Sequence, residues 1–367
     1  MAVNTVLLDF SVDKETVADR HKRDLTLMNI EAALNEFIRN IVKAHLVEMP
    51  DGFLQILTAD RGVSVTVRGF VEGFIAVNIE YFKGEEEPPL FNYEEGRLLE
   101  SSLQCALRSN RCKMFPPIRR GAPFDVYLTS SDERILEYDI DEVLFEEKSP
   151  YQKVQIVHSK SFGNLLLLDD LQNLSERDLI YTETLMQRGK EDYRDKEIVI
   201  LGGGDGALLW ELLKEQPKFV TMLELDKVVM DACKKYMRSA CGDCLDNYHG
   251  SNYEIVVGDC VEVLNNYIKD GRKFDYVFGD LTDVPISPTP QGEIWDFIRL
   301  ILDDSLKVLK PGGKYMTHAN GASSPSSLEM LEKELGKLQP PVTFTQDRAF
   351  VPSFMEDWVF YQVSFKK

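Results

Sequence analysis

Four predicted β-strands in the C-terminal half of the chain each end in acidic side chains. These acids are Asp205, Glu224 with Asp226, Asp259 and Asp280. In an open α/β sheet, the carboxyl ends of parallel strands meet at one crevice, and ligands bind there. Like charges gathered at one crevice repel one another, so a positively charged ligand is needed to offset the repulsion. The positions of the acids therefore predict a binding site for a cation.

A glycine-rich turn lies at the first of these strand ends. An apolar run at 198–201 is followed by Gly202, Gly203 and Gly204, and then by helix-forming residues over 207–214. Glycine lets the backbone turn tightly and lets a ligand approach closely. A strand, a glycine turn and a helix together form the nucleotide-binding start of a doubly wound α/β sheet. The same spacing fits a dinucleotide fingerprint, so the turn alone leaves the kind of nucleotide open.

The acids differ in what they could bind. Glu224 lies about 20 residues after Gly202, which is the spacing of an acid that binds a ribose diol. Asp259 can accept a hydrogen bond from the exocyclic amine of a purine, and it can also cap the helix that follows. Asp205 and Asp280 have no diol or base to bind. We therefore expect this second pair to face an amine substrate.

Alternating strands and helices predict the sheet that carries these acids. Strands are expected at 198–201, 219–225, 253–257, 274–278 and 314–318, with a long helix over 294–309. This order is typical of a doubly wound (Rossmann-type) parallel sheet. The segment Lys310-Pro-Gly-Gly-Lys before the last strand resembles methyltransferase-like folds, which argues against a nicotinamide oxidoreductase.

Two smaller domains are expected upstream. Residues 1–115 read as an N-terminal α+β domain with a helix at 29–43, and we find no catalytic constellation in it. The segment 113–121, which contains two prolines, is predicted to be a linker. Residues 116–175 contain short strands between turn residues, which is typical of a small antiparallel sheet. The predicted catalytic domain is then 176–367.

The composition excludes several classes of function. The net charge of −19 argues against nucleic acid or an acidic membrane as a partner. We expect no signal peptide at the N-terminus, and no stretch of the sequence approaches the ~18 apolar residues of a membrane span. The six cysteines lack a zinc-site pattern, because Cys241 and Cys244 form a lone CxxC pair. We expect reduced thiols, no metal and a cytoplasmic location.

Several segments resemble the aminopropyltransferases, the family of spermidine and spermine synthases. They are Ser149-Pro-Tyr-Gln-Lys-Val, Asp178-Leu-Ile-Tyr-Thr-Glu, Leu201-Gly-Gly-Gly-Asp-Gly, Leu223-Glu-Leu-Asp, Gly258-Asp-Cys and Asp275-Tyr-Val-Phe-Gly-Asp-Leu-Thr. The resemblance covers about residues 117–365 and is closest to the members that make spermine. Their N-terminal domain, which has a decarboxylase-like fold, resembles the N-terminal region here and implies a homodimer.

The resemblance implies a reaction and a set of site residues. An aminopropyl group would move from decarboxylated S-adenosylmethionine, a co-substrate rather than a cofactor, to the polyamine spermidine, giving spermine and methylthioadenosine. The implied donor-binding residues are Gln152, Gly202, Gly204, Glu224, Asp226, Asp259 and Cys260. The implied acceptor-binding residues are Tyr181, Asp205, Phe354 and Glu356. Asp280 would accept the proton, with Asp205 as the second catalytic acid.

Two positions leave the acceptor open. Phe354 stands where the spermine-forming pattern has tyrosine, and Asp283 resembles the acidic loop of spermidine synthases. Putrescine is therefore an alternative acceptor. An S-adenosylmethionine-dependent methyltransferase shares the sheet and the nucleoside site and is a further alternative. That class would not need Asp205 and Asp280 to face a polyamine.

Overall fold

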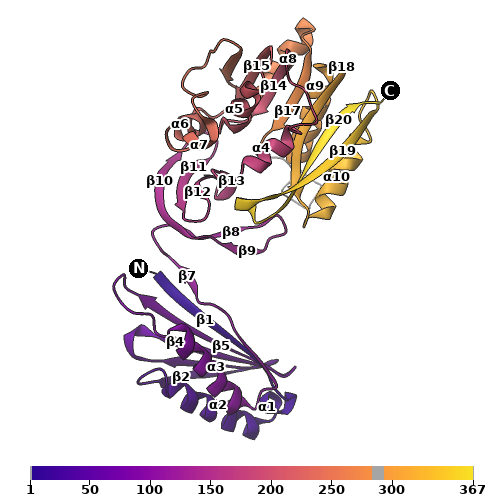
Figure 1. Cartoon of the computed structure of the whole chain (residues 1–367). Helices are drawn as coiled ribbons and strands as arrows, with labels where there is room; N and C mark the ends of the chain where they lie inside the picture. Colours follow the sequence, from indigo (N-terminus) through magenta and orange to yellow (C-terminus); the bar gives the residue numbers. More distant parts are fainter. Residues whose placement is uncertain (1, 283–292, 367) are drawn as a thin grey trace. The chain divides into compact units, whose positions relative to one another are not determined.

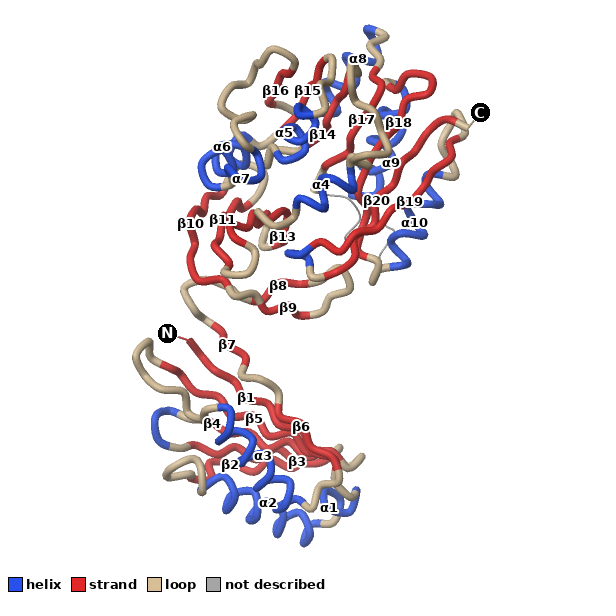
Figure 2. Tube along the Cα trace, viewed as in Figure 1, coloured by secondary structure: helices blue, strands red, loops and turns tan. Residues whose placement is uncertain are grey.

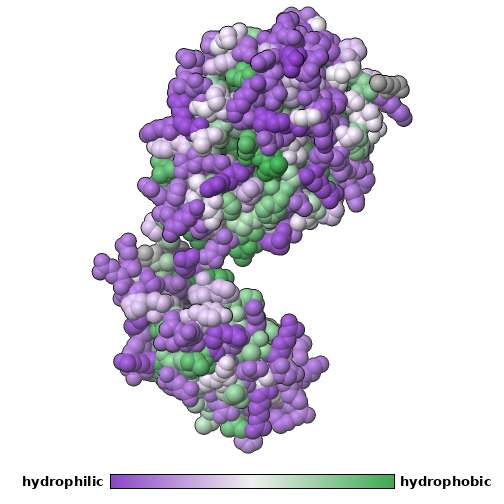
Figure 3. Space-filling view, in the orientation of Figure 1, coloured by the Kyte–Doolittle hydropathy of each residue, from purple (hydrophilic) through white to green (hydrophobic). Residues whose placement is uncertain are grey.

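The computed structural model describes residues 2–282 and 293–366. The chain divides into two compact units, Met1–Asp125 and Val126–Lys367 (Figure 1). No helix among these described residues is long and apolar enough to cross a membrane. On the face of the second unit seen in Figure 3, hydrophilic side chains dominate and an apolar patch interrupts them. Each unit is described by itself below.

The first unit is a sheet packed against helices, as the α+β prediction requires. Alternate residues of β4 (Ser64–Phe70) are buried, including Val65 and Val67, and they join one apolar cluster with residues of α2 and α3. The strand order is β2-β3-β4-β5-β1-β6, and β7 also pairs with β1. The other strands are β1 Ala2–Ser11, β2 Val42–Met49, β3 Gly52–Thr58, β5 Phe74–Lys83, β6 Arg111–Met114 and β7 Ile118–Arg120. The helices are α1 Lys14–Ala18, α2 Arg20–Asn35 and α3 Tyr93–Leu107.

The structure corrects two predictions for this unit. The helix expected at 29–43 ends earlier, at Asn35, and residues from Val42 onward form the edge strand β2. The expected linker at 113–121 instead supplies parts of β6 and β7, which pair antiparallel with β1. The compact unit therefore continues to Asp125 rather than ending at residue 115. Pro116 and Pro117 lie between β6 and β7, so neither strand loses an N–H donor to them.

The second unit begins with two small antiparallel sheets. One is the hairpin of β8 (Tyr127–Thr129) and β9 (Ile135–Glu137). The other has four strands in the order β10-β11-β12-β13. Its strands are β10 Ile140–Lys148, β11 Lys153–Ser159, β12 Gly163–Leu168 and β13 Leu171–Ser175. The small antiparallel β region expected from the sequence is therefore present.

The large sheet of this unit confirms the predicted doubly wound fold and adds two strands. Its order is β16-β15-β14-β17-β18-β20-β19; the first five run parallel, whereas β20 pairs antiparallel with β18 and β19. Helices cover both faces (Figure 2). The strands are β14 Glu197–Gly202, β15 Phe219–Glu224, β16 Tyr253–Val257, β17 Phe274–Asp280, β18 Leu309–Gly321, β19 Val342–Val351 and β20 Glu356–Phe365. The helices are α4 Leu179–Leu185, α5 Ala207–Lys214, α6 Lys227–Tyr236, α7 Arg238–Cys241, α8 Cys260–Asp270, α9 Glu293–Lys307 and α10 Pro325–Leu335.

The apolar run in β14 explains why this strand is central. Ile198 and Ile200 pack into the apolar cluster on one face of the sheet, while Val199 and Leu201 pack into the cluster on the other face. A strand buried on both faces reads as a continuous apolar run. Its carboxyl end, at Gly202, lies between β15 and β17, where ligands bind in such sheets.

Candidate active site

A cavity of about 420 Å³ opens at the carboxyl ends of the central strands. Among the described residues that line it there are acids but no Lys or Arg. The acids are Asp169, Asp205, Glu224, Asp226, Asp259 and Asp280. The sheet thus brings the acids predicted at four strand ends into one cavity. An unbalanced group of carboxylates in one cavity favours a cationic ligand.

The glycine turn allows backbone and acids to pack closely. Gly202 and Gly203 have φ values of +83° and +78°, a region that other residues rarely adopt. A Cβ atom on Gly202 would lie 2.2 Å from the backbone oxygen of Asp280, and one on Gly204 would lie 2.6 Å from Oε2 of Glu224. The turn therefore needs glycine for its conformation and for the approach of two acids.

Asp280 and Asp205 stand on the same side of the cavity. The Tyr181 hydroxyl donates a hydrogen bond of 3.1 Å to Oδ1 of Asp280. Burial, together with the charge of Asp205, raises the pKa of Asp280 from 3.8 to about 8. Burial also raises the pKa of Asp205, although its Oδ1 accepts a 2.7 Å hydrogen bond from the backbone N–H of Ala207. In the absence of a cation, this pair resists holding two negative charges.

Glu224 and Asp226 are linked through the backbone at the end of β15. Oε1 of Glu224 accepts a 2.7 Å hydrogen bond from the N–H of Asp226, and burial raises the pKa of Glu224 to about 7. Asp226 caps α6, since its Oδ1 accepts from the N–H of Val228 at 3.0 Å. Its Oδ2 accepts from the Ser149 hydroxyl at 2.6 Å and from Nε2 of Gln152 at 3.1 Å. Asp226 therefore orients Gln152 at the cavity.

Asp259 and Cys260 lie at the end of the next strand along the chain. Asp259 caps α8 through a 2.8 Å hydrogen bond from the N–H of Val261. Cys260 is buried in the cavity wall, and burial raises the pKa of its thiol to about 12. The thiol is therefore neutral at physiological pH and acts as a small apolar surface.

Aromatic side chains form another part of the cavity lining, here called the aromatic wall: Tyr181, His318, Phe354 and Trp358. The ring of Phe354 lies 6.0 Å from that of Tyr181 and 4.7 Å from that of Trp358, centroid to centroid. His318 pairs with Trp358 Nε1 at 3.4 Å and with the backbone oxygen of Leu281 at 3.1 Å. Burial lowers the pKa of His318 to about 4, so its ring is neutral.

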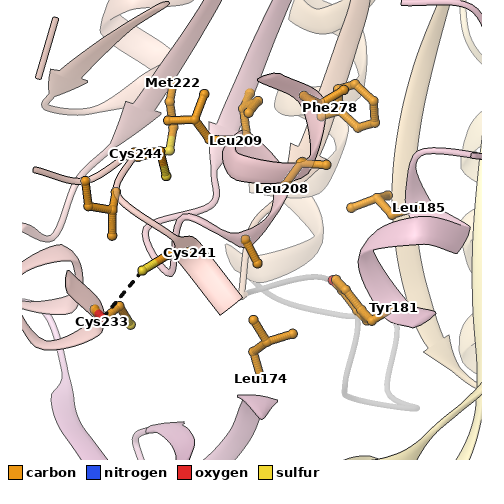
Figure 4. Close-up of a cluster of buried hydrophobic side chains, with 14 of the residues drawn as sticks. Leu174, Tyr181, Leu185, Leu208, Leu209, Met222, Cys233, Cys241, Cys244 and Phe278 are labelled. Carbon is orange, nitrogen blue, oxygen red and sulfur yellow. Dashed lines mark hydrogen bonds between the residues drawn. The ribbon is translucent and has the colours of Figure 1, made fainter. Parts of the chain in front are cut away.

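The CxxC pair lies in the cluster of buried apolar side chains drawn in Figure 4. Cys241 Sγ is 3.6 Å from the backbone oxygen of Cys233, and Cys244 Sγ is 3.4 Å from that of Gly206. All three thiols are buried. In the part of the chain that the structure describes, no cluster of three or more His, Cys, Asp or Glu could hold a metal ion. Cys244 packs against Gly206, directly after the glycine turn.

The structure separates Glu356 from the other predicted site residues. It is absent from the described cavity lining, whereas Phe354 and Trp358 on either side of it are included. Its Oε1 accepts a 3.0 Å hydrogen bond from the N–H of Ser131, and its Oε2 accepts a 2.8 Å bond from the Ser131 hydroxyl. Asp283, which bears on the choice of acceptor, lies outside the described residues.

A polar part of the cavity lining, next to the turn between β12 and β13, was missed in the sequence analysis. Asp169, Gln172 and Asn173 lie on or beside the turn between β12 and β13 and line the cavity. The sequence held one signal for this region, the pair Asp169-Asp170 between two apolar runs. Both residues adopt left-handed φ values, 47° and 64°, in a tight hairpin turn. The pair predicts a turn, but only the fold shows that the turn faces the acids of the large sheet.

Comparisons with known proteins agree with this architecture. Residues 178–367 match the family described as "Spermine/spermidine synthase domain", and residues 126–176 match the "Spermidine synthase tetramerisation domain". A polyamine aminopropyltransferase of Sulfurisphaera tokodaii is 39% identical over 155 residues, which is 41% of this chain and 49% of the relative. Thermospermine synthase ACAULIS5 of Arabidopsis thaliana is 28% identical over 236 residues, 63% of this chain and 66% of the relative. The chain thus spans about half to two thirds of the length of these curated relatives.

Solved structures share the fold. Spermidine synthase from Thermotoga maritima aligns with a TM-score of 0.54 and 19% identity, covering 66% of this chain and 79% of the other. A spermidine synthase in complex with the transition state analogue AdoDATO aligns with a TM-score of 0.56 and 20% identity, covering 66% and 80%. The family match extends over more than half of the residues and includes the glycine turn and its acids. The chain belongs to the spermine/spermidine synthase family.

Proposed function

We propose that the protein transfers an aminopropyl group from decarboxylated S-adenosylmethionine to spermidine, giving spermine and methylthioadenosine. The observation that carries this proposal is the cavity whose described lining has six acids and no Lys or Arg. Both substrates are cations, so the acids would stabilise them together. The family match and the aminopropyltransferases among the relatives support the same reaction class.

The donor would occupy the side of the cavity nearest β15 and β16. Glu224 would bind the ribose diol, and Asp259 would accept a hydrogen bond from the adenine amine. Cys260 would pack against the base, and Gln152 would contribute the amide that Asp226 orients. Gly202 and Gly204 would let the nucleoside approach the backbone. No other cofactor or metal is proposed, because the sulfonium of the donor supplies the leaving group.

The acceptor amine would react beside Asp280. Its nitrogen lone pair attacks the propyl carbon bound to sulfur; the C–S bond breaks, and its electron pair stays on sulfur as a neutral thioether. One N–H proton then passes to Asp280. An amine with a pKa near ~10.4 is mostly charged at neutral pH, and deprotonating it costs about 4 kcal/mol. A carboxyl whose pKa is raised by burial is a better matched proton acceptor than a surface aspartate.

The remaining acceptor-side residues would have separate roles in binding and positioning. Asp205 would bind an amine that stays charged, and Tyr181 would hold Asp280 in place through its hydrogen bond. Phe354 and Trp358 would contact the methylene chain and favour the neutral form of the attacking amine. Glu356 would bind the far amine of spermidine.

One observation favours a second candidate, putrescine. Glu356 is bonded to Ser131 and does not line the cavity, so the proposed acceptor-side residues leave two carboxylates in the described lining, Asp205 and Asp280. Two carboxylates match the two amines of a diamine, whereas a third carboxylate would stabilise the third amine of a triamine.

We also propose a homodimer formed through the first unit, which supplies no residue to the described cavity lining. Sedimentation of the full-length protein tests this assembly: a mass of two chains supports it, and a single-chain mass at micromolar concentration contradicts it.

The reaction is tested by incubating the protein with decarboxylated S-adenosylmethionine and either spermidine or putrescine, with products separated by chromatography. Equal amounts of methylthioadenosine and spermine support the first candidate, and spermidine formed from putrescine supports the second. Methyl transfer from intact S-adenosylmethionine, without aminopropyl transfer, would instead identify a methyltransferase.

A further inference from the structure

The β8–β9 hairpin holds Glu356 with both hydrogen-bond donors of one serine. The N–H of Ser131 lies 3.0 Å from Oε1 of Glu356, and the Ser131 hydroxyl lies 2.8 Å from Oε2. Both residues are buried, with 8% and 6% of their surface exposed. The fit is close: a Cβ atom on Gly321 would lie 2.3 Å from both Oε2 of Glu356 and Oγ of Ser131. The carboxylate is thus confined to one position.

The donors that hold Glu356 are neutral. Among the described ion pairs none includes Glu356. The nearby Arg134 instead donates from Nε to the two carboxylate oxygens of Asp132, at 2.7 Å and 2.8 Å. A buried carboxylate with neutral donors forms weaker bonds than it would with an ammonium ion, because charge-assisted hydrogen bonds are roughly twice as strong. Glu356 therefore retains the capacity to bind a cation that reaches it.

This contact lies at the acceptor end of the cavity. Trp358 lines the cavity two residues after Glu356 on the same strand, and side chains two apart on a strand point to the same face. On the other flank, Gln172 lines the cavity and donates a 3.1 Å hydrogen bond to the backbone oxygen of Thr129 in β8. The hairpin is therefore joined to the cavity wall on both sides of its loop.

We propose that Ser131 determines the preferred length of the acceptor by competing with the acceptor's far ammonium group for Glu356. This inference rests on the aminopropyl transfer proposed above. A diamine that is short enough to bind Asp205 and Asp280 does not contact Glu356. The hydrogen bonds between Ser131 and Glu356 therefore do not affect its binding. A triamine must draw Glu356 away from Ser131, and the lost hydrogen bond weakens its binding.

Steady-state kinetics with spermidine and putrescine test this competition. Ser131→Ala removes the hydroxyl, so KM for spermidine should fall about fivefold, the usual net value of one hydrogen bond, while KM for putrescine stays within about twofold. Ser131→Cys keeps a weaker donor of similar size and should give a smaller shift in the same direction. The hydrogen bond from the Ser131 hydroxyl to Glu356 involves no atom that reacts, so kcat should change little for either acceptor.

Ser130→Ala is the matched control. The Ser130 hydroxyl is buried in the same loop and donates to Oδ1 of Asp132 at 2.6 Å, away from Glu356. Ser130→Ala perturbs the hairpin without removing a bond to Glu356. The ratio of KM for spermidine to KM for putrescine should therefore stay unchanged. In a Glu356→Gln background the Ser131→Ala effect should also disappear, because coupled residues are non-additive.

The outcomes separate the two proposals. An equal KM change for both acceptors in Ser131→Ala, the same ratio change in Ser130→Ala, or an undiminished Ser131→Ala effect beside Glu356→Gln would overturn the role of Ser131 while leaving aminopropyl transfer intact. Wild-type protein that forms no methylthioadenosine with either acceptor would overturn both.

Discussion

The two sides of the cavity hold their acids by different means. On the donor side, Glu224, Asp226 and Asp259 each accept a backbone N–H hydrogen bond within two residues. On the acceptor side, Asp280 accepts a tyrosine hydroxyl, and burial raises its pKa to about 8. Backbone dipoles stabilise negative charge before any ligand arrives. The donor-side acids are therefore fixed by the backbone, as is Asp205 on the acceptor side, whereas Asp280 is held by one side chain. Each side contains an acid whose pKa burial raises, Glu224 to about 7 and Asp280 to about 8, and Asp280 most needs a nearby cation to become charged.

This difference predicts that the largest effect comes from Asp280. Asp280→Asn keeps the shape of the side chain but removes the proton acceptor, so kcat should fall about 10²–10⁴-fold. Affinity for methylthioadenosine should change little, because the donor side is intact. Turnover is measured as methylthioadenosine formed, with Asp231→Asn on the exposed face of α6 as the control. Near-normal turnover in Asp280→Asn would show that another group takes the proton.

A smaller effect is expected from the donor side. Gly204→Ala would place a Cβ atom 2.6 Å from Oε2 of Glu224 and displace that carboxylate. Losing one charged hydrogen bond should weaken methylthioadenosine binding about 10- to 100-fold, measured by calorimetry. Gly336→Ala is the control, since its nearest contact would be an ordinary 3.4 Å. Unchanged affinity in Gly204→Ala would mean that Glu224 does not bind the nucleoside.

The raised pKa values predict how stability depends on pH. The folded state holds protons on Asp280 up to about pH 8 and on Glu224 up to about pH 7, above their usual values of 3.8 and 4.5. The stability from this protonation is complete below pH 3.8 and is lost as the pH rises through about 8. Asp280→Asn should therefore become more stable relative to wild type by about 3–4 kcal/mol between pH 5 and 8. Urea unfolding measures the difference, and a constant gap across this range would contradict it.

The smallest effect is expected from Tyr181→Phe. Its hydroxyl bond lowers the pKa of Asp280, opposing the effect of burial. Without the bond, the acid limb of the kcat/KM profile should move to higher pH, and kcat should fall about fivefold. A pH profile that coincides with wild type would show that the 3.1 Å contact does not act on the base.

The same contrast explains how much the sequence could predict. The donor side follows from local rules, because an acid at the end of a parallel strand faces the crevice whatever the rest of the chain does. Glu224 and Asp259 were found in this way, and Asp205 and Asp280 lie in the same cavity. The doubly wound sheet followed from its alternating strands and helices.

The acceptor side depends on contacts between distant segments. His318 pairs with Trp358 across two strands, and Ser131 meets Glu356 from a hairpin more than 200 residues earlier in the chain. No local periodicity encodes such pairings. The linker prediction failed for a related reason: β6 pairs with β1, which lies at the opposite end of the unit's sequence, and such long-range strand pairing is not visible in composition.

The central claim is that uncompensated acids select cationic ligands in this cavity. Calorimetric titration with decarboxylated and intact S-adenosylmethionine tests it directly, because the two differ by one carboxylate and the described lining offers no Lys or Arg to pair with it. The decarboxylated form should bind at least about tenfold more tightly, the effect of about 1.4 kcal/mol of unpaired charge. Equal or tighter binding of intact S-adenosylmethionine would contradict it.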